Sequence, residues 1–330
     1  MRVRQPLVLL LLPSFILSGC ATLPILPDTK PRTPLPAELA HYYDYSRQPL
    51  EAHVESTQVG DGYQIQRLSL GPPTSSGSRP IRIDWYKPSR AGRLPAVVLS
   101  PILAGNDLYV REFARFFAAR GLHAAIVYRP KEVFSADRDL KDVETHFRES
   151  VVEIRQAIDW LEKEDSVNAE RIGSYGISLG AILTTIVAAV EPRVRVNVFG
   201  LPAGHIADII MTSRDKAIRK RRTAYLKQRG WSQEEAVQQL RAVMISEPMQ
   251  FASHIDPGRG LVIAALFDRV LGFQRSMELW RAMGKPQLIL LPTGHYTAYL
   301  ATPYLKMATY SFLRRGLSAP ANRSRRSTVK

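Results

Sequence analysis

The sequence contains almost no cysteine, since Cys20 is the only one among 330 residues. A single thiol cannot form a disulfide within the chain, so the fold must depend on its hydrophobic core. The sequence also lacks a Cys/His cluster at zinc-binding spacing and a phosphate-binding loop of the Gly-x-x-x-x-Gly-Lys kind. We therefore expect a protein that needs no metal and no organic cofactor.

The chain also lacks an apolar run long enough to span a bilayer. Leu7 to Leu17 is apolar, but it falls well short of the ~20 residues that a membrane-spanning helix needs. A positively charged start precedes it and Leu17-Ser18-Gly19-Cys20 ends it, which predicts a signal peptide over residues 1–19. These four residues closely resemble the lipobox of bacterial lipoproteins, in which the cysteine is lipidated and becomes the mature N-terminus. An ordinary secretory signal with an incidental Cys20 is the alternative.

The resemblance to lipoproteins implies that acyl chains on Cys20 hold the protein at a membrane, each buried CH₂ contributing about 0.8 kcal/mol. Ala21, and not an aspartate, follows the cysteine, as in lipoproteins sent to an outer membrane, so we expect the protein there, facing the periplasm. Residues 20–40 contain five prolines and predict an extended tether. Residues 318–330 are basic and poor in apolar side chains, which predicts a disordered tail.

Basic residues outnumber acidic ones, with 45 Lys and Arg against 30 Asp and Glu and a formal net charge of +15. Much of the excess lies in residues 214–229 and 314–330. Such a balance is typical of proteins that bind nucleic acid, but no recognition motif accompanies it and an export signal is predicted before it. We therefore expect no nucleic-acid partner. The run from Arg219 to Arg222 predicts a solvated helix face, with contact to anionic lipid headgroups as the alternative.

Strand-like and helix-like segments alternate after residue 62. A hairpin is predicted by apolar residues near 65–70 and 81–86, on either side of a loop rich in Gly, Pro and Ser. Strands predicted at 96–99, 124–128, 172–175, 194–199, 261–267 and 287–291 alternate with helices predicted at 110–120, 143–161, 181–190, 273–283 and 298–313. This order predicts an α/β fold with one doubly wound, mostly parallel sheet in residues 41–317.

The interval of about 204–253 interrupts this alternation. Ser232-x-x-Glu235, placed before the apolar Ala236, Val237 and Leu240, is a capping box, so the interval has helices of its own. We expect these helices to form a cap over the ends of the strands.

A Gly-x-Ser-x-Gly pattern at residues 176–180 joins a predicted strand to a predicted helix. In such an elbow the serine takes a strained backbone conformation that exposes its hydroxyl. Glycine is needed at Gly176 and Gly180, because a Cβ at either position would collide with the crowded chain. We therefore predict that Ser178 is a nucleophile; a chance match at the end of a strand is the alternative.

A serine hydroxyl needs a base beside it, and the base needs an acid to orient it. Asp268 follows the strand predicted at 261–267, and His295 follows the last predicted strand. Residues that follow parallel strands meet at the carboxyl edge of the sheet, where ligands bind in such folds, and the order Ser, Asp, His is typical of one class of hydrolase. Asp208, after an earlier strand, is a rival for the acid, and Asp268 could instead cap a helix.

With elbow, acid and histidine in this order, residues 94–313 resemble the α/β-hydrolase superfamily, and within it the branch of dienelactone hydrolases and prolyl-oligopeptidase-like esterases. The resemblance implies that Ser178 is the nucleophile and His295 the general base and acid. It implies that Asp268 fixes the imidazole tautomer and stabilises the imidazolium.

The resemblance also implies an oxyanion hole made by two backbone N–H groups, one of them from Leu179. The second normally lies in a loop that begins His-Gly, whereas this chain has Ser100-Pro101-Ile102-Leu103. Proline has no N–H, so Ile102 is the expected donor and Leu103 the alternative. Losing one such donor lowers the rate by on the order of 10²–10³, so this departure bears on activity and not on the fold.

These residues predict a membrane-anchored serine hydrolase that cleaves a small-molecule or lipid carboxyl ester through an acyl-enzyme. A peptidase or acyltransferase with the same triad is an alternative, because the fold does not choose the acyl acceptor. A non-catalytic envelope lipoprotein that binds an anionic polymer or lipid is another, given the changed oxyanion loop and the basic cap. The sequence sets no oligomeric state.

Overall fold

The computed structural model describes residues 32–71, 79–102, 108–129 and 137–318. The predicted signal peptide, Cys20, most of the predicted tether and the predicted tail after residue 318 lie outside the described residues, as does Leu103. Within the described ranges, no helix is long and apolar enough to cross a bilayer.

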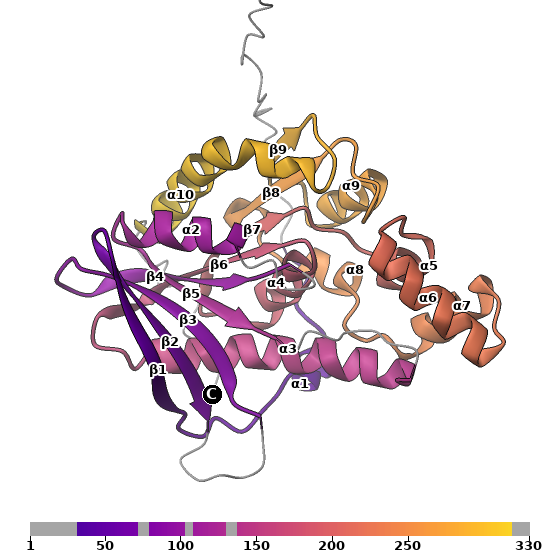
Figure 1. Ribbon diagram of the computed structural model, residues 1–330, viewed down its shortest axis with the longest axis horizontal. Helices are drawn as coiled ribbons and strands as arrows, with labels where there is room; N and C mark the ends of the chain where they lie inside the picture. The colour runs from indigo at the N-terminus through magenta and orange to yellow at the C-terminus, as the bar shows by residue number, and fades with distance from the viewer. Residues whose placement is uncertain (1–31, 72–78, 103–107, 130–136, 319–330) are drawn as a thin grey trace, which may run out of the picture.

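The described chain has one sheet with the strand order β1-β2-β3-β5-β4-β6-β7-β8-β9 (Figure 1). The strands are β1 (Glu51–Gly60), β2 (Tyr63–Gly71), β3 (Ile81–Pro88), β4 (Leu94–Ser100), β5 (His123–Tyr128), β6 (Val167–Ile177), β7 (Val194–Gly200), β8 (Gly260–Ala265) and β9 (Gln287–Leu291). The strands from β5 to β9 along the sheet pair parallel, whereas β1, β2 and β3 are antiparallel at one edge. The predicted doubly wound, mostly parallel sheet is confirmed, as is the hairpin of β2 and β3.

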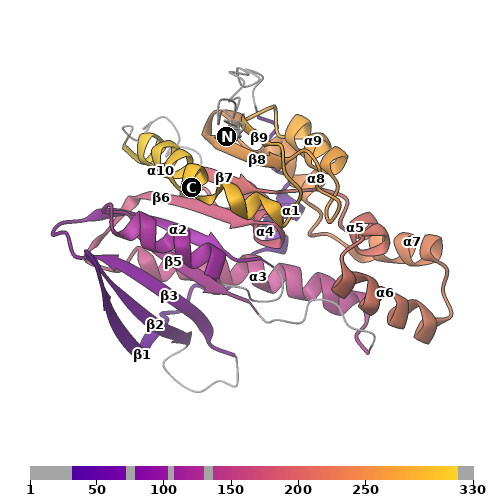
Figure 2. The same cartoon turned by 45° about the horizontal axis from the view of Figure 1, so that its top comes forward.

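Helices cover both faces of the sheet (Figures 1 and 2). The α-helices are α1 (Ala37–Tyr42), α2 (Leu108–Ala118), α3 (Leu140–Leu161), α4 (Leu179–Val190), α5 (Ile206–Thr212), α6 (Lys216–Arg229), α7 (Gln233–Val243), α8 (Pro248–Phe251), α9 (Phe273–Ala282) and α10 (Thr302–Ser318). Short 3₁₀ turns are η1 (Ala252–His254), η2 (Pro257–Arg259) and η3 (Thr297–Ala301). Buried side chains of α3, α4 and α9 pack on one face, and those of α2 and α10 pack on the other.

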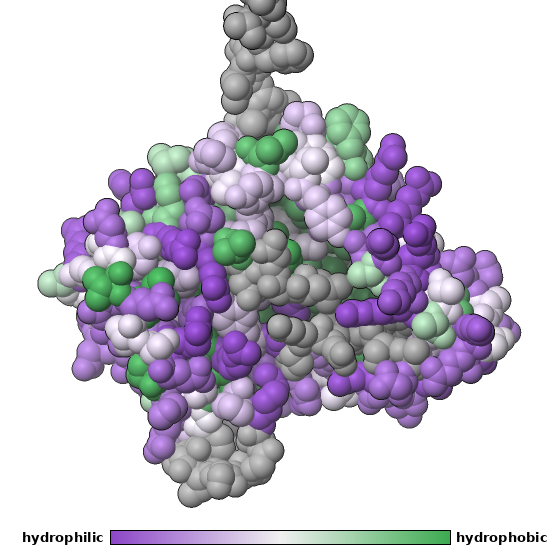
Figure 3. Space-filling view, viewed as in Figure 1, coloured by the Kyte–Doolittle hydropathy of each residue, from purple (hydrophilic) through white to green (hydrophobic). Residues whose placement is uncertain are grey.

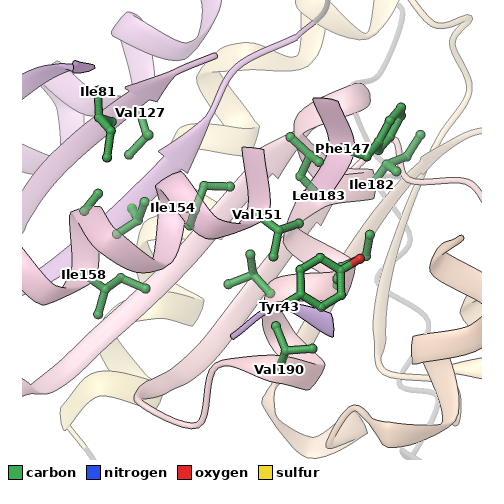
Figure 4. Packing of buried hydrophobic residues seen from close by; sticks show 14 of the residues in the cluster. Tyr43, Ile81, Val127, Phe147, Val151, Ile154, Ile158, Ile182, Leu183 and Val190 are labelled. Atoms are coloured by element: carbon green, nitrogen blue, oxygen red, sulfur yellow. The ribbon is translucent and has the colours of Figure 1, made fainter. Parts of the chain in front are cut away.

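The central strands are apolar throughout because both of their faces are buried. In β4, Ala96 and Val98 contact the core on the α3 side, while Val97 and Leu99 contact the core on the α2 side, as the two-residue period of a strand requires. Figure 4 shows the first of these cores, to which Val151, Ile154 and Ile158 of α3 and Ile182, Leu183 and Val190 of α4 all contribute. Each fully buried side chain of this size contributes about 1.5–3 kcal/mol, so the strands hold their carboxyl ends firmly.

The end of the predicted tether differs from expectation. Leu35 and Leu39 pack against the core on the α3 side, and the His254 ring donates a hydrogen bond to the Thr33 carbonyl at 2.8 Å. Tyr43, just after α1, is fully buried. Residues 33–40 therefore belong to the folded body. Their leucines pack on the core although prolines stand beside them in the sequence.

Helices α5 to α8 occupy the predicted cap interval between β7 and β8, and α5, α6 and α7 lie to one side of the sheet (Figure 2). The predicted capping box is confirmed, since the Ser232 hydroxyl accepts from the Glu235 N–H and the Glu235 carboxylate accepts from the Ser232 N–H. The basic run of α6 is only partly a solvated face. Arg219 and Lys220 are exposed, but Arg222 is half-buried and donates to the carbonyls of Ile210 and Ser213.

Candidate active site

Ser178 lies between β6 and α4 in the strained conformation that the elbow motif predicts. Its backbone has φ 56° and ψ −119°, in the left-handed half of φ space that residues with a Cβ rarely adopt. Such strain costs roughly 1–3 kcal/mol and persists only where the surroundings impose it. The Ser178 N–H donates to the Gly200 carbonyl at 2.8 Å, and the Ser178 carbonyl accepts from Ala181 and Ile182, so both sides of the residue are fixed.

The two glycines of the motif allow close backbone approach. A Cβ on Gly176 would lie 2.1 Å from the Gly180 carbonyl oxygen, and one on Gly180 would lie 2.0 Å from the Ser100 carbonyl oxygen. Both neighbours are backbone atoms that cannot swing aside. The second contact also shows that the end of β4 presses directly on the first turn of α4, next to the serine.

The structure brings together the three residues that the sequence selects. Ser178 Oγ lies 3.0 Å from His295 Nε2, and His295 Nδ1 lies 2.7 Å from Asp268 Oδ2. All three side chains are largely buried. The rival acid, Asp208, instead forms a bidentate ion pair with Arg241 of α7. His295 therefore has Asp268 as its carboxylate partner.

Asp268 is held as an ionised acceptor. Burial by itself would raise its pKa, but the hydrogen bond and charge of His295 and the N–H groups of Val270 and Leu271 outweigh burial and bring the pKa below its ordinary value. Those two N–H groups donate to Oδ1 at 2.8 and 3.0 Å, which leaves Oδ2 for the imidazole. Because an ionised carboxylate only accepts, Nδ1 of His295 carries a proton and Nε2 is free to accept from Ser178.

The predicted oxyanion donors lie beside Ser178. Leu179 is the first residue of α4, where N–H groups have no partner within the helix, and Ile102 lines the same cavity as Ser178. One residue here carries no signal in the sequence. Arg129, just after β5, donates from its two terminal nitrogens to the Pro101 carbonyl at 2.7 Å and to the Ile102 carbonyl at 2.5 Å. The contact depends on how β4 and β5 are aligned in the sheet, which the sequence alone does not show.

A cavity of about 560 Å³ opens beside Ser178. Its walls are mostly apolar and come from the elbow, the loop after β4, α5 and α6: Ile102, Ile177, Ile182, Ile206, Ile209 and Ile218. Figure 3 shows hydrophobic side chains within a hollow next to the mostly hydrophilic surface of the cap. The site can therefore surround an apolar group next to the reactive hydroxyl.

A hydrogen bond ties the His295 loop to the cap across this cavity. The Tyr296 hydroxyl donates to Asp215 Oδ2 at 2.5 Å, and Asp215 Oδ1 caps α6 by accepting from Ala217 and Ile218. Burial, together with this bond to a carboxylate, raises the pKa of Tyr296. Among the described residues, no group of three or more His, Cys, Asp or Glu side chains is placed to hold a metal ion.

Comparison with known protein sequences finds only partial relatives. No family model matches this chain. A probable 2-oxo-3-(5-oxofuran-2-ylidene)propanoate lactonase of a Bradyrhizobium species is 30% identical over 118 residues, which are 34% of this chain and 47% of that protein. An uncharacterized protein of Mycobacterium tuberculosis is 24% identical over 204 residues, which are 60% of this chain and 46% of that protein. The chain thus spans about half the length of the curated relatives it matches.

Solved structures match over most of the chain. An acetyl xylan esterase of a Paenibacillus species has a TM-score of 0.67 at 18% identity, covering 87% of this chain and 97% of its own. Acetyl xylan esterase 1 of a Thermoanaerobacterium species has a TM-score of 0.62 at 19% identity, covering 87% and 96%. A 2,6-dihydroxy-pseudo-oxynicotine hydrolase has a TM-score of 0.55 at 17% identity, covering 83% and 69%. The fold is that of the α/β hydrolases, as the sequence resemblance implied.

Proposed function

We propose that this protein is a serine hydrolase that cleaves carboxyl esters through an acyl-enzyme, with Ser178, His295 and Asp268 as its catalytic residues. The observation that carries the proposal is the continuous chain of contacts from Ser178 Oγ to His295 Nε2 and from His295 Nδ1 to Asp268, at 3.0 and 2.7 Å. The similarity to two acetyl xylan esterases and to a probable lactonase, which are named for reactions at ester bonds, supports this reaction class.

The geometry supports a two-step acyl transfer to water. Ser178 Oγ attacks the ester carbonyl carbon while His295 Nε2 takes the hydroxyl proton, and the developing oxyanion accepts from the N–H groups of Leu179 and Ile102. The imidazolium, stabilised by Asp268, then gives its proton to the leaving alkoxide. Water attacks the acyl-enzyme with His295 as base, and the carboxylic acid leaves as Ser178 regains its proton.

The cavity supports a substrate with an apolar body. Its volume of about 560 Å³ and its isoleucine-rich walls suit a small molecule or one chain of a lipid ester, since ligand pockets typically measure roughly 300–1,000 Å³. The cap supplies a large part of these walls through α5 and α6. The length of the acyl chain accepted should therefore depend on cap residues.

We also propose that lipidated Cys20 anchors the enzyme at the outer membrane, facing the periplasm. Support comes from the Leu-Ser-Gly-Cys pattern and from Ala21. Metabolic labelling with an alkyne fatty acid tests this proposal. The wild-type protein should take up the label and be recovered in the outer-membrane fraction, and the Cys20→Ser variant should do neither. An unlabelled wild-type protein recovered without membranes would overturn the anchor and leave the hydrolase untouched.

A fluorophosphonate probe tests the enzyme directly, because Ser178 Oγ would displace fluoride and form a stable phosphonate ester. We expect labelling of the wild-type protein, loss of labelling in Ser178→Ala, and hydrolysis of p-nitrophenyl esters of graded chain length. Circular dichroism should show both proteins equally folded. A folded wild-type protein that neither labels nor hydrolyses would favour the non-catalytic binding alternative, whereas labelling with transfer to alcohols or cleavage of peptides would favour the acyltransferase or peptidase.

A further inference from the structure

The oxyanion loop of this chain lacks the His-Gly start that is usual in the fold, and Arg129 contacts it instead. The predicted donor is the N–H of Ile102, which belongs to the peptide unit between Pro101 and Ile102. Within the described residues, no hydrogen bond of the protein uses this N–H. The direction of the Ile102 N–H is therefore set by the contacts of the Pro101 carbonyl, which belongs to the same planar peptide unit.

The sheet places Arg129 opposite this peptide. Strands β4 and β5 are parallel neighbours, and Leu99 pairs with Ile126. Continuing this parallel register by three residues on each chain puts residue 102 opposite residue 129. The guanidinium then reaches two consecutive carbonyls of the neighbouring chain, those of Pro101 at 2.7 Å and Ile102 at 2.5 Å.

Because the peptide is planar, the contact of Arg129 with the Pro101 carbonyl also fixes the orientation of the Ile102 N–H. In a trans peptide the C=O and N–H point in opposite directions, and the described chain has no cis peptide. Fixing the Pro101 oxygen toward Arg129 therefore points the Ile102 N–H away from Arg129. Since Arg129 also holds the Ile102 oxygen, the peptide units on both sides of the Ile102 Cα are fixed, by a planar fork with little freedom of its own.

The elbow at Ser178 contacts the same stretch of backbone. A Cβ on Gly180 would lie 2.0 Å from the Ser100 oxygen and 2.8 Å from the Pro101 oxygen, so the first turn of α4 is in contact with this stretch. Ile102 also lines the cavity with Ser178 and Leu179. The loop backbone thus contacts both the first turn of α4 and the guanidinium of Arg129, next to the Ser178 hydroxyl.

We propose that Arg129 is the positioning residue of the oxyanion hole, holding the Pro101–Ile102 peptide so that the Ile102 N–H faces the oxyanion formed at Ser178. This rests on the proposed esterase function. The guanidinium also strengthens the donor, because a positive charge at the carbonyl end of a peptide polarises its N–H. Arg129 performs this task without touching the substrate.

Kinetics of Arg129 variants on a short p-nitrophenyl ester test the proposal. In Arg129→Met we expect kcat to fall by about 10–100-fold, somewhat less than the loss of a whole donor, while KM changes by less than about threefold. Affinity for a trifluoromethyl ketone, which forms a tetrahedral adduct with its oxyanion in the hole, should fall by the same factor as kcat/KM. Arg129→Lys keeps the charge without the fork and should recover only part of the loss. Added guanidine at millimolar concentration should partly restore Arg129→Ala.

Arg148 of α3 gives a matched control, because it is also half-buried, also donates to two backbone carbonyls, those of Tyr42 and Asp44, and does not line the cavity. Arg148→Met should change the melting temperature about as much as Arg129→Met and leave kcat unchanged. Equal kcat for Arg129→Met and wild type, or parallel losses of activity in both variants that follow the folded fraction, would overturn the proposal. A wild-type protein that neither turns over ester nor labels with fluorophosphonate would overturn the esterase function first.

Discussion

The carboxyl edge of the sheet and the cap beside it hold their residues in different ways. At the sheet edge, Ser178 and Asp268 follow strands buried on both faces, and backbone contacts fix each one. In the cap, α6 buries only Tyr225, and α7 buries only Ala236 and Leu240. The cap helices depend on the capping box of α7, on the Asp215 N-cap of α6 and on a few contacts, such as the bond between Tyr296 and Asp215.

The rate of the reaction and the selectivity among substrates should therefore respond to substitutions in different regions. In the proposed mechanism, groups at the sheet edge act on the ester carbonyl, which every substrate would share, so their loss should lower kcat for all esters alike. Cap residues would then contact only the variable part of a substrate. Their substitution should alter the preference among esters and leave the chemistry intact. Substitutions in the two regions test this division.

Replacing Asp268 by Asn should give the largest effect. The amide cannot hold the proton on Nδ1 of His295 in the same way, so kcat should fall by about 10³–10⁴-fold for short and long esters equally. The measurement is kcat on p-nitrophenyl esters of two to twelve carbons. A loss that depends on chain length would break the division between sheet edge and cap.

Alanine at Gly180 tests the tightness of the sheet edge, because the new Cβ would lie 2.0 Å from the Ser100 oxygen. We expect unfolding free energy to fall by about 3 kcal/mol in urea titrations. Gly230 of the cap is the matched position: its φ is +67° with nothing within 4 Å of a new Cβ, so Gly230→Ala should cost about 1 kcal/mol. Activity should fall in the first variant alone, and equal costs would contradict the comparison.

Lowering the pH should reduce the free energy of unfolding, because it favours protonation of the buried His123 of β5. Burial lowers the pKa of this histidine from 6.5 to about 4, and its Nδ1 has no hydrogen-bond partner among the described residues. Between these values the folded state binds fewer protons than the unfolded state, so the contribution of His123 is complete above pH 6.5 and is lost as the pH falls toward 4.

The expected loss over this window is on the order of 3 kcal/mol, at 1.36 kcal/mol for each unit of pKa shift. Urea unfolding at pH 7 and pH 4.5 measures it, and His123→Gln, which keeps a donor for the Ser166 carbonyl, should reduce the difference. Helices α6 and α7 contain no histidine, so their hydrogen exchange should respond less. An unchanged pH dependence in the variant would rule His123 out as the cause.

Enlarging Ile218 of α6 should give the smallest effect. Its side chain lines the cavity, so Ile218→Phe should lower kcat/KM for long-chain esters by about tenfold and change it little for acetate esters. Lys220 on the same helix is exposed, and Lys220→Phe serves as the control. An equal loss of kcat/KM for short and long esters would show that Ile218 affects the reaction at the carbonyl and not the choice of substrate.

The sequence predicted those parts of the molecule that leave a local pattern. The two glycines around Ser178 and the residues after the last strands, Asp268 and His295, were selected because elbow geometry and strand order need only short stretches of chain. Strand β1 was not predicted, because Glu51–Gly60 is almost fully exposed and shows no alternation of apolar residues. Arg129 was not predicted either, since its contact depends on how β5 is aligned with β4.

The prolines at the N-terminal end of the described chain predicted an extended tether, but Leu35 and Leu39 pack on the core. Composition alone could not show this, because packing depends on which surface lies within reach. His254, far along the chain, provides the contact for Thr33.

The attachment of Thr33 to the folded body fixes the length of chain between Cys20 and that body. If Cys20 carries acyl chains as we propose, only residues 21–32 lie between the anchored cysteine and Thr33, a span of at most ~47 Å at up to 3.6 Å per residue. The proposed enzyme would then search for esters in a layer next to the lipid surface.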